Sequence, residues 1–226
     1  ADTDVEAVVV CSETNRHEPL VFAAAEAGKH LFVEKPLGIG AKDAYAMAEA
    51  IERAGVIFQT GYFMRGNPIH QFLKAQWLRQ LWHSDELRQT NCHAGSLKGY
   101  FDTEWRWMAD MEQLDVAPLV IWALTWSTVP NENINAEIFT ASLGVATRRY
   151  GEIDEYGEAL IDFADGVVGS LAAGWVDVAH PVSLVLSGTE GYAYVVNGQL
   201  YFQSSKVEGA DGQSPWIDPP EPWPHA

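Results

Sequence analysis

Apolar runs and helix-forming segments alternate over the first 66 residues, and this alternation is the feature that most constrains the fold. Residues 5–11, 31–33 and 56–60 are short runs of apolar and β-branched side chains, typical of strands in a parallel sheet. Residues 18–27 and 41–54 are helix-forming, and each segment is followed by a glycine that can end a helix. Strands and helices at this spacing form right-handed crossovers. The sequence therefore predicts a parallel sheet whose first strand is buried on both faces.

Three strands and two helices make only about half of a doubly wound nucleotide-binding domain. In such a domain a Gly-x-Gly-x-x-Gly loop follows the first strand, whereas here Gly38-Ile39-Gly40 follows the wrong strand and is interpreted as a turn. The chain starts at Ala1 with no basic-then-apolar leader, so either a leader was removed or the chain is a fragment, and the incomplete sheet favours a fragment. We predict that residues 1–66 are the C-terminal half of a Rossmann-like domain. Its open apolar edge is expected to be covered by a partner or within a rearranged dimer.

From residue 67 onward the pattern changes to helices followed by many short strands. Residues 68–82 and 114–128 carry apolar side chains at helical spacing. Between residues 159 and 203, short apolar runs alternate with Asp-Gly, Gly-Thr-Glu-Gly and Asn-Gly turns, which are typical of antiparallel hairpins. The predicted fold class is therefore α/β followed by α+β, with an open, mostly antiparallel sheet in residues 67–213. The prolines of residues 214–226 predict an extended tail.

The charge is strongly acidic, with 31 Asp and Glu against 14 Lys and Arg. Such a surface repels a phosphate backbone, and no apolar run approaches the roughly 20 residues that span a bilayer, so we expect neither a nucleic acid nor a membrane partner. Cys11 and Cys92 form no Cys-x-x-Cys pair, which argues against a zinc site or a disulfide framework. Cys11 is expected to pack as a small apolar side chain. Asp154 and Glu155 are adjacent and are interpreted as solvated surface.

Glu34-Lys35-Pro36 stands at the carboxyl end of the second predicted strand, where open α/β sheets bind their ligands. Pro36 restricts the backbone and can hold a fixed turn, cis or trans. A lysine held there can stabilise a developing alkoxide on a substrate and pass on its proton. The structural alternative is a strand end followed by an ordinary turn.

The turn after the first strand contains Ser12, with His17 downstream, and Gly28-Lys29-His30 precedes the second strand. With Glu34-Lys35-Pro36, this pattern resembles the Gfo/Idh/MocA family, which includes glucose–fructose oxidoreductase and inositol dehydrogenase. Residues 156–191 are similar to the C-terminal sheet domain of that family. The resemblance implies an oxidoreductase that binds NAD or NADP and transfers hydride between the nicotinamide and a carbinol carbon of a sugar or polyol. It also implies a homo-oligomer formed through the C-terminal sheet, and we expect a cytoplasmic location.

The same resemblance implies catalytic roles for Lys35 and Asp115, and substrate contacts for Trp105 and Arg106. Cofactor contacts are implied for residues at the ends of the first two strands and at the exit of the first domain, namely Ser12, Asn15, His17, Glu34, Lys35, Pro36 and Arg65. A helix N-cap and its first turn is the structural interpretation of the residues that follow the first strand. Arg65 can equally be an ordinary surface charge.

The family's Asp-x-x-x-His pattern is incomplete in this chain. Asp115 is present, but Leu119 stands at the histidine position and cannot transfer a proton. His93, His180 or Lys35 alone would then have to act as the acid or base. Two functions remain open: a NAD(P)-dependent sugar or polyol oxidoreductase of full or impaired activity, and a non-catalytic relative that acts as an oligomeric binding or scaffold protein.

Overall fold

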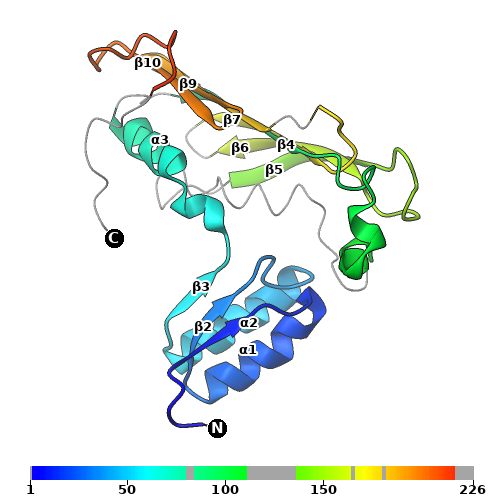
Figure 1. Ribbon diagram of the computed structural model, residues 1–226. Coiled ribbons are helices and arrows are strands. Elements are labelled where there is room, and N and C mark those ends of the chain that lie inside the picture. The colour runs from blue at the N-terminus through cyan, green and yellow to red at the C-terminus, as the bar shows by residue number, and fades with distance from the viewer. Residues whose placement is uncertain (1, 80–83, 111–135, 164–165, 180–181, 217–226) are drawn as a thin grey trace. The chain divides into compact units, whose positions relative to one another are not determined.

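The computed structural model describes residues 2–79, 84–110, 136–163, 166–179 and 182–216 (Figure 1). These residues form two compact units: the first contains residues 2–62 and 99–110, and the second contains residues 63–98 and the described residues from 136 onward. The domain boundaries expected at residues 66 and 213 stay predictions. The predicted helix at residues 114–128 and most of the predicted tail lie outside the described residues.

The first unit is built on a sheet of three parallel strands in the order β1-β2-β3. Its elements, in chain order, are β1 (Ala7–Val10), α1 (His17–Glu26), β2 (His30–Val33), α2 (Ala41–Ala54) and β3 (Phe58–Thr60). The helices end where Gly28 and Gly55 adopt positive φ angles of 67° and 65°, which favour glycine. The predicted partial parallel sheet is confirmed, but both of its helices lie on one face, so the described part of the sheet is not doubly wound.

The core of the first unit lies on one face of this sheet. Val10 and Val33 are 3% and 0% exposed and belong to one cluster with side chains of both α1 and α2. On the other face, Val9 is 66% exposed, and Cys11 just after the strand is exposed as well. The predictions that the first strand is buried on both faces and that Cys11 packs as an apolar side chain are therefore wrong. Both helices pack on the same face, so the apolar run of β1 is covered on one side only.

The second unit is built on a seven-stranded sheet with the order β10-β9-β8-β4-β7-β6-β5. The sheet is mostly antiparallel, as predicted, but β4 and β7 pair in parallel, and β5 coincides with no predicted strand. The elements of this unit have the following bounds: α3 (Pro68–Arg79), β4 (Ser84–Cys92), β5 (Ala136–Gly144), β6 (Tyr156–Phe163), β7 (Val168–Gly174), β8 (Val182–Gly188), β9 (Gly191–Val196) and β10 (Gln199–Ser204).

Helix α3 packs against one face of the seven-stranded sheet. Phe72 and Leu73 of α3 are buried in a cluster that includes Leu87, Leu186 and Phe202 from three different strands. The rings of Phe72 and Phe202 meet edge to face, with their centroids 5.4 Å apart. Large aromatic and aliphatic side chains of this kind supply most of the stabilisation of a two-layer unit.

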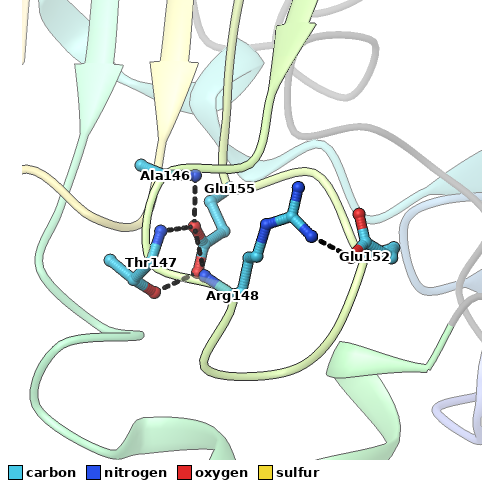
Figure 2. A network of polar contacts seen from close by, with 5 residues as sticks. All are labelled: Ala146, Thr147, Arg148, Glu152 and Glu155. Atoms are coloured by element: carbon cyan, nitrogen blue, oxygen red, sulfur yellow. Dashed lines mark hydrogen bonds and ion pairs between the residues drawn. The ribbon is translucent and has the colours of Figure 1, made fainter.

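The loop between β5 and β6 folds around a buried carboxylate (Figure 2). Glu155 is 1% exposed and accepts hydrogen bonds from the backbone N–H groups of Ala146 (2.7 Å), Thr147 and Arg148 (3.4 Å), and from the Thr147 hydroxyl. Burial alone would raise the pKa of Glu155, but the hydroxyl and the N–H groups outweigh burial and lower it. The interpretation of Glu155 as solvated surface is therefore wrong, because successive N–H groups form a concave site that can hold a buried anion.

Candidate functional site

The carboxyl ends of β1, β2 and β3 meet at one edge of the parallel sheet, as they must in a parallel arrangement. The loops that leave this edge carry most of the predicted site residues: Ser12, Asn15 and His17 after β1, and Glu34, Lys35 and Pro36 after β2. Backbone hydrogen bonds continue between these loops and the neighbouring strands. The Glu34 N–H donates to the Val10 carbonyl at 2.9 Å, so the start of the β2 loop is held beside β1.

The turn after β2 leaves the Lys35 side chain exposed while its backbone is anchored on both sides. The Lys35–Pro36 peptide bond is cis, and Pro36 is buried. The Lys35 N–H donates to the Glu34 carboxylate at 3.1 Å. A cationic side chain therefore extends from a fixed backbone at the edge where ligands of such sheets bind.

Glu34 also joins the loop after β2 to the loop after β3. A Cβ at Gly61 would lie 2.9 Å from the carboxylate carbon of Glu34 and from both of its oxygens, which is closer than a real Cβ can approach. The carboxylate occupies the space that a side chain at position 61 would need, so a larger residue there would displace the end of the Glu34 side chain. The sequence signal for this contact is a glycine directly after a predicted strand.

The loop after β1 begins with Ser12, whose half-buried hydroxyl donates to the Glu13 carbonyl at 3.4 Å. Asn15 is exposed in a short 3-10 helix, η1 (Thr14–Arg16). Neither η1 nor α1 has a side-chain hydrogen bond at its N-cap, so the N-cap interpretation of these residues is wrong. Asn15 does lie in the turn that follows β1, and it is exposed.

His17, the first residue of α1, is buried rather than accessible, with 1% of its surface exposed. Its Nδ1 lies 3.1 Å from the Leu37 carbonyl oxygen, and its Nε2 lies 3.1 Å from the Ser12 carbonyl oxygen. Both ring nitrogens thus face backbone oxygens of the protein. The cofactor contact expected for His17 stays a prediction, and the geometry around the ring is that of a structural residue.

The remaining predicted residues are not brought to this edge by the described contacts. Arg65 is exposed in η2 (Phe63–Gly66) of the second unit. Trp105 and Arg106 are exposed in η4 (Glu104–Ala109), where the Trp105 ring stacks on Tyr100 with centroids 6.4 Å apart. Asp115 lies outside the described residues, and so does Leu119.

The two alternative histidines gain no support as an acid or base. His93 is exposed after β4, and its Nδ1 accepts the Gly95 N–H at 3.0 Å, while His180 lies outside the described residues. In the described parts of the chain, no group of three or more His, Cys, Asp and Glu side chains could hold a metal ion. No helix in those parts is long and apolar enough to cross a membrane.

The edge of the parallel sheet therefore offers an ammonium, a hydroxyl and an amide, together with a carboxylate that the protein itself uses. This set can donate several hydrogen bonds to a ligand that carries hydroxyl or other oxygen groups, and the ammonium places one positive charge beside it. It contains no nucleophile with an adjacent base, so it does not support acyl transfer.

Comparison with known sequences points to one family. Residues 1–62 match the GFO_IDH_MocA model, described as an oxidoreductase family with an NAD-binding Rossmann fold. The chain is 24% identical over 226 residues to scyllo-inositol 2-dehydrogenase (NAD(+)) of Bacillus subtilis, a match that covers 94% of the chain and 61% of that protein. A shorter match, 48% identical over 64 residues, relates 28% of the chain to 19% of myo-inositol 2-dehydrogenase of Thermotoga maritima.

Comparison with solved structures agrees on the fold. An inositol dehydrogenase homolog of Azotobacter vinelandii, complexed with NAD+, superposes with a TM-score of 0.80 at 18% identity, over 89% of this chain and 55% of that one. Levoglucosan dehydrogenase, complexed with NADH and levoglucosan, gives a TM-score of 0.75 at 20% identity, over 92% and 59%. The chain thus spans less than two thirds of the length of these relatives. The match of residues 1–62 to the family model and the shared fold of both units agree with the Glu34-Lys35-Pro36 pattern, and they support the resemblance of the chain to the Gfo/Idh/MocA oxidoreductase family.

Proposed function

We propose that this chain is part of an NAD(P)-dependent oxidoreductase that acts on a sugar or polyol. The observation that carries the proposal is the exposed Lys35, held on an anchored turn at the carboxyl edge of a parallel sheet. The names of the relatives support the substrate class, since they include dehydrogenases of inositol and levoglucosan. The structures of similar proteins in complex with NAD+ or NADH support the proposed nicotinamide cofactor.

In this proposal the nicotinamide, when bound, accepts or donates the hydride, and the protein handles the substrate oxygen. The Lys35 ammonium donates a hydrogen bond to that oxygen, stabilises its negative charge as hydride leaves, and holds or returns the proton. Ser12 and Asn15 donate to oxygens of the cofactor ribose. Asp115 orients the substrate hydroxyls, and the Trp105–Arg106 pair contacts the substrate, as the family resemblance implies.

We further propose that the pyrophosphate of the cofactor is bound by a segment or partner that covers the free edge of β1. That edge carries backbone groups that a further parallel strand would pair. The exposed Val9 side chain lies on the sheet face opposite α1 and α2, where a further helix would cover it. In this arrangement the described residues form the nicotinamide end of the site, and the covering segment or partner forms the phosphate end.

Titration of the chain with NADH and with NADPH, followed by fluorescence or calorimetry, tests the proposal. We expect submillimolar binding of one of them and oxidation of inositol or levoglucosan with that cofactor. Lys35→Ala should lower the rate of hydride transfer by roughly a hundredfold, since it removes the group that stabilises the alkoxide. Lys29→Ala is the matched control, because Lys29 donates to the Asp2 carbonyl away from the site. Absence of binding by the wild-type chain would sink the proposal for this chain.

A second function is favoured by one residue, Leu119, which replaces the expected proton-transferring histidine. If the chain is a non-catalytic relative that binds or scaffolds, NADH binding without turnover is expected. Leu119→His should then create measurable oxidation of a polyol. If the wild-type chain already turns over and Leu119→His changes its rate by less than about twofold, the non-catalytic interpretation is wrong.

We propose that two copies of the chain pair through the open face of the seven-stranded sheet. This face carries a tyrosine stack that includes Tyr194, and Val168, which is 45% exposed. A groove of about 420 Å³ runs along it, with Arg88 on one wall and Glu158 on the other. Within one copy Arg88 forms an ion pair with Glu86, and Glu158 accepts from the Tyr156 hydroxyl. Under twofold symmetry, the opposite charges of Arg88 and Glu158 can add a contact between the copies to these pairs.

Sedimentation measurements test this pairing. We expect a dimer for the wild-type chain and a monomer for Val168→Asp, which places a charge on the face at the start of β7. Val178→Asp is the control, because Val178 is exposed in the loop after β7 and not in the sheet. A wild-type chain that sediments as a monomer at micromolar concentration contradicts the proposal.

A further inference from the structure

His17 links two loops of the candidate site through its two ring nitrogens. Its Nε2 lies 3.1 Å from the carbonyl oxygen of Ser12, in the loop after β1. Its Nδ1 lies 3.1 Å from the carbonyl oxygen of Leu37, in the loop after β2 and two residues beyond Lys35. The imidazole is rigid, and its two nitrogens point outward in different directions. The ring therefore fixes the distance between the two loops.

The chemistry of the contacts makes the linkage specific to histidine. Carbonyl oxygens only accept hydrogen bonds, so the ring must donate to them. A neutral imidazole donates to one of the two oxygens at a time, and an imidazolium donates to both. No ring nitrogen is then left for a ligand, and a residue that is 1% exposed has almost no surface to offer one.

The segment that follows Lys35 is tightly packed as well. Pro36 is buried, and a Cβ at Gly38 would lie 3.0 Å from the Ala44 nitrogen and 3.1 Å from the Met47 methyl group. The chain between these two residues therefore lies directly on α2, and the contact from His17 to Leu37 falls in the middle of it. This leaves Lys35 between two fixed points, the Glu34 carboxylate on one side and the Leu37 carbonyl on the other.

We propose that His17 is a positioning residue. It holds the loop that carries Lys35 at a fixed distance from the loop after β1, and it acts on the reaction through Lys35 without touching the cofactor or the substrate. This inference rests on the proposed function for its catalytic consequence. Its structural part, the tie between the two loops, is independent of that function.

Hydrogen exchange followed by mass spectrometry tests the structural part on the full chain. In His17→Leu, the ring that lies between the two carbonyl oxygens and can donate to either of them is lost. We expect exchange in residues 11–16 and 34–40 to become roughly tenfold faster or more, while the rest of the first unit changes by less than about twofold. His30→Leu is the matched control, since the His30 Nδ1 accepts the Ile57 N–H at 3.1 Å at the opposite end of β2. It should accelerate exchange near Ile57 and leave residues 34–40 unchanged.

A second variant still tests the proposal if His17→Leu fails to fold. Gln in place of His17 keeps an amide that can donate to one carbonyl, so exchange should rise in one loop and not in both. Unchanged exchange in residues 34–40, or a uniform rise over the whole first unit, overturns the proposal.

NADH binding and turnover test the catalytic part. We expect His17→Leu to lower the rate of hydride transfer roughly tenfold or more, because a small misplacement of an acid is costly, and to change the dissociation constant for NADH by less than about threefold. Binding weakened tenfold or more, with exchange in the loops unchanged, would show that His17 contacts the cofactor directly and would overturn the proposal. If the wild-type chain binds no NADH, the proposed function fails, and the exchange experiment still decides the role of His17 in the loops.

Discussion

Replacing Glu155 with glutamine removes the negative charge from the centre of the β5–β6 loop and keeps the shape of the side chain. The carboxylate accepts three backbone N–H groups and one hydroxyl, and the two strongest backbone bonds come from Ala146 and Thr147. A hydrogen bond to a charged acceptor contributes roughly 1 kcal/mol more than one to a neutral acceptor. The glutamine oxygen can still accept both bonds, and the hydroxyl can turn to accept from the amide. We therefore expect Glu155→Gln to lower the free energy of unfolding by about 2 kcal/mol at neutral pH.

The effect depends on pH with a definite sign. The pKa of Glu155 in the folded chain is below its usual value of 4.5, because the Thr147 hydroxyl and the N–H groups outweigh the effect of burial. The stabilisation by the carboxylate is therefore fully present above pH 4.5 and is lost as the pH falls through the folded-state pKa. Glutamine does not titrate. The difference in stability between the two proteins should be largest at neutral pH and should shrink in acid.

Urea unfolding followed by tryptophan fluorescence measures this difference. Trp175 is a suitable reporter, since its indole N–H donates to the Asp154 carbonyl beside the loop at 3.0 Å. Glu152→Gln is the matched control: Glu152 forms an exposed ion pair with Arg148 in the same loop, so its loss should cost no more than about 0.5 kcal/mol (Figure 2). Equal effects of the two substitutions at neutral pH, or a gap that widens in acid, would refute the reasoning.

Two further predictions concern the first unit and the cysteines. Gly61→Ala should destabilise the chain by about 0.5–1.5 kcal/mol in thermal unfolding, because the new methyl group displaces the Glu34 carboxylate from the Lys35 N–H. Gly66→Ala, where a Cβ meets nothing within 4 Å, should be neutral, and equal effects at the two sites would contradict the close approach. Burial raises the pKa of the Cys92 thiol to about 11, while Cys11 is exposed. A thiol reagent at mildly alkaline pH should therefore label Cys11 rapidly and Cys92 only on unfolding. Rapid labelling of a Cys11→Ser variant would contradict this prediction.

The sequence predicts those parts of the fold that depend on local patterns. Alternating apolar and helical segments are sufficient for β1, β2, β3 and both helices, and Asp-Gly and Asn-Gly turns are sufficient for the later hairpins. The sequence does not show what covers an apolar run, so the exposure of Val9 could not be foreseen. The parallel pairing of β4 with β7 is equally hidden, because it depends on which distant strands become neighbours and not on the pattern within either one.

The same distinction between local patterns and long-range contacts applies to the candidate site. The placement of Glu34-Lys35-Pro36 at the carboxyl edge follows from the parallel sheet, and the structure has it there. The partners of His17 could not be predicted, since backbone carbonyls have no sequence signature and a ring that binds two of them looks like any other histidine. The burial of Glu155 depends in the same way on N–H groups that every loop possesses.

The position of β4 in the seven-stranded sheet has a consequence for how the chain reaches its fold. β4 is the first strand of that sheet to be synthesised, yet both of its partners, β7 and β8, come much later in the chain. The other six strands form two meanders of sequential antiparallel neighbours, β5-β6-β7 and β8-β9-β10, which can assemble from short-range contacts alone. Insertion of β4 between these meanders is a long-range closure, and such closures are slow. Until it occurs, the edges of β4, β7 and β8 are all unpaired, and a nascent chain is most exposed to wrong pairing at that stage.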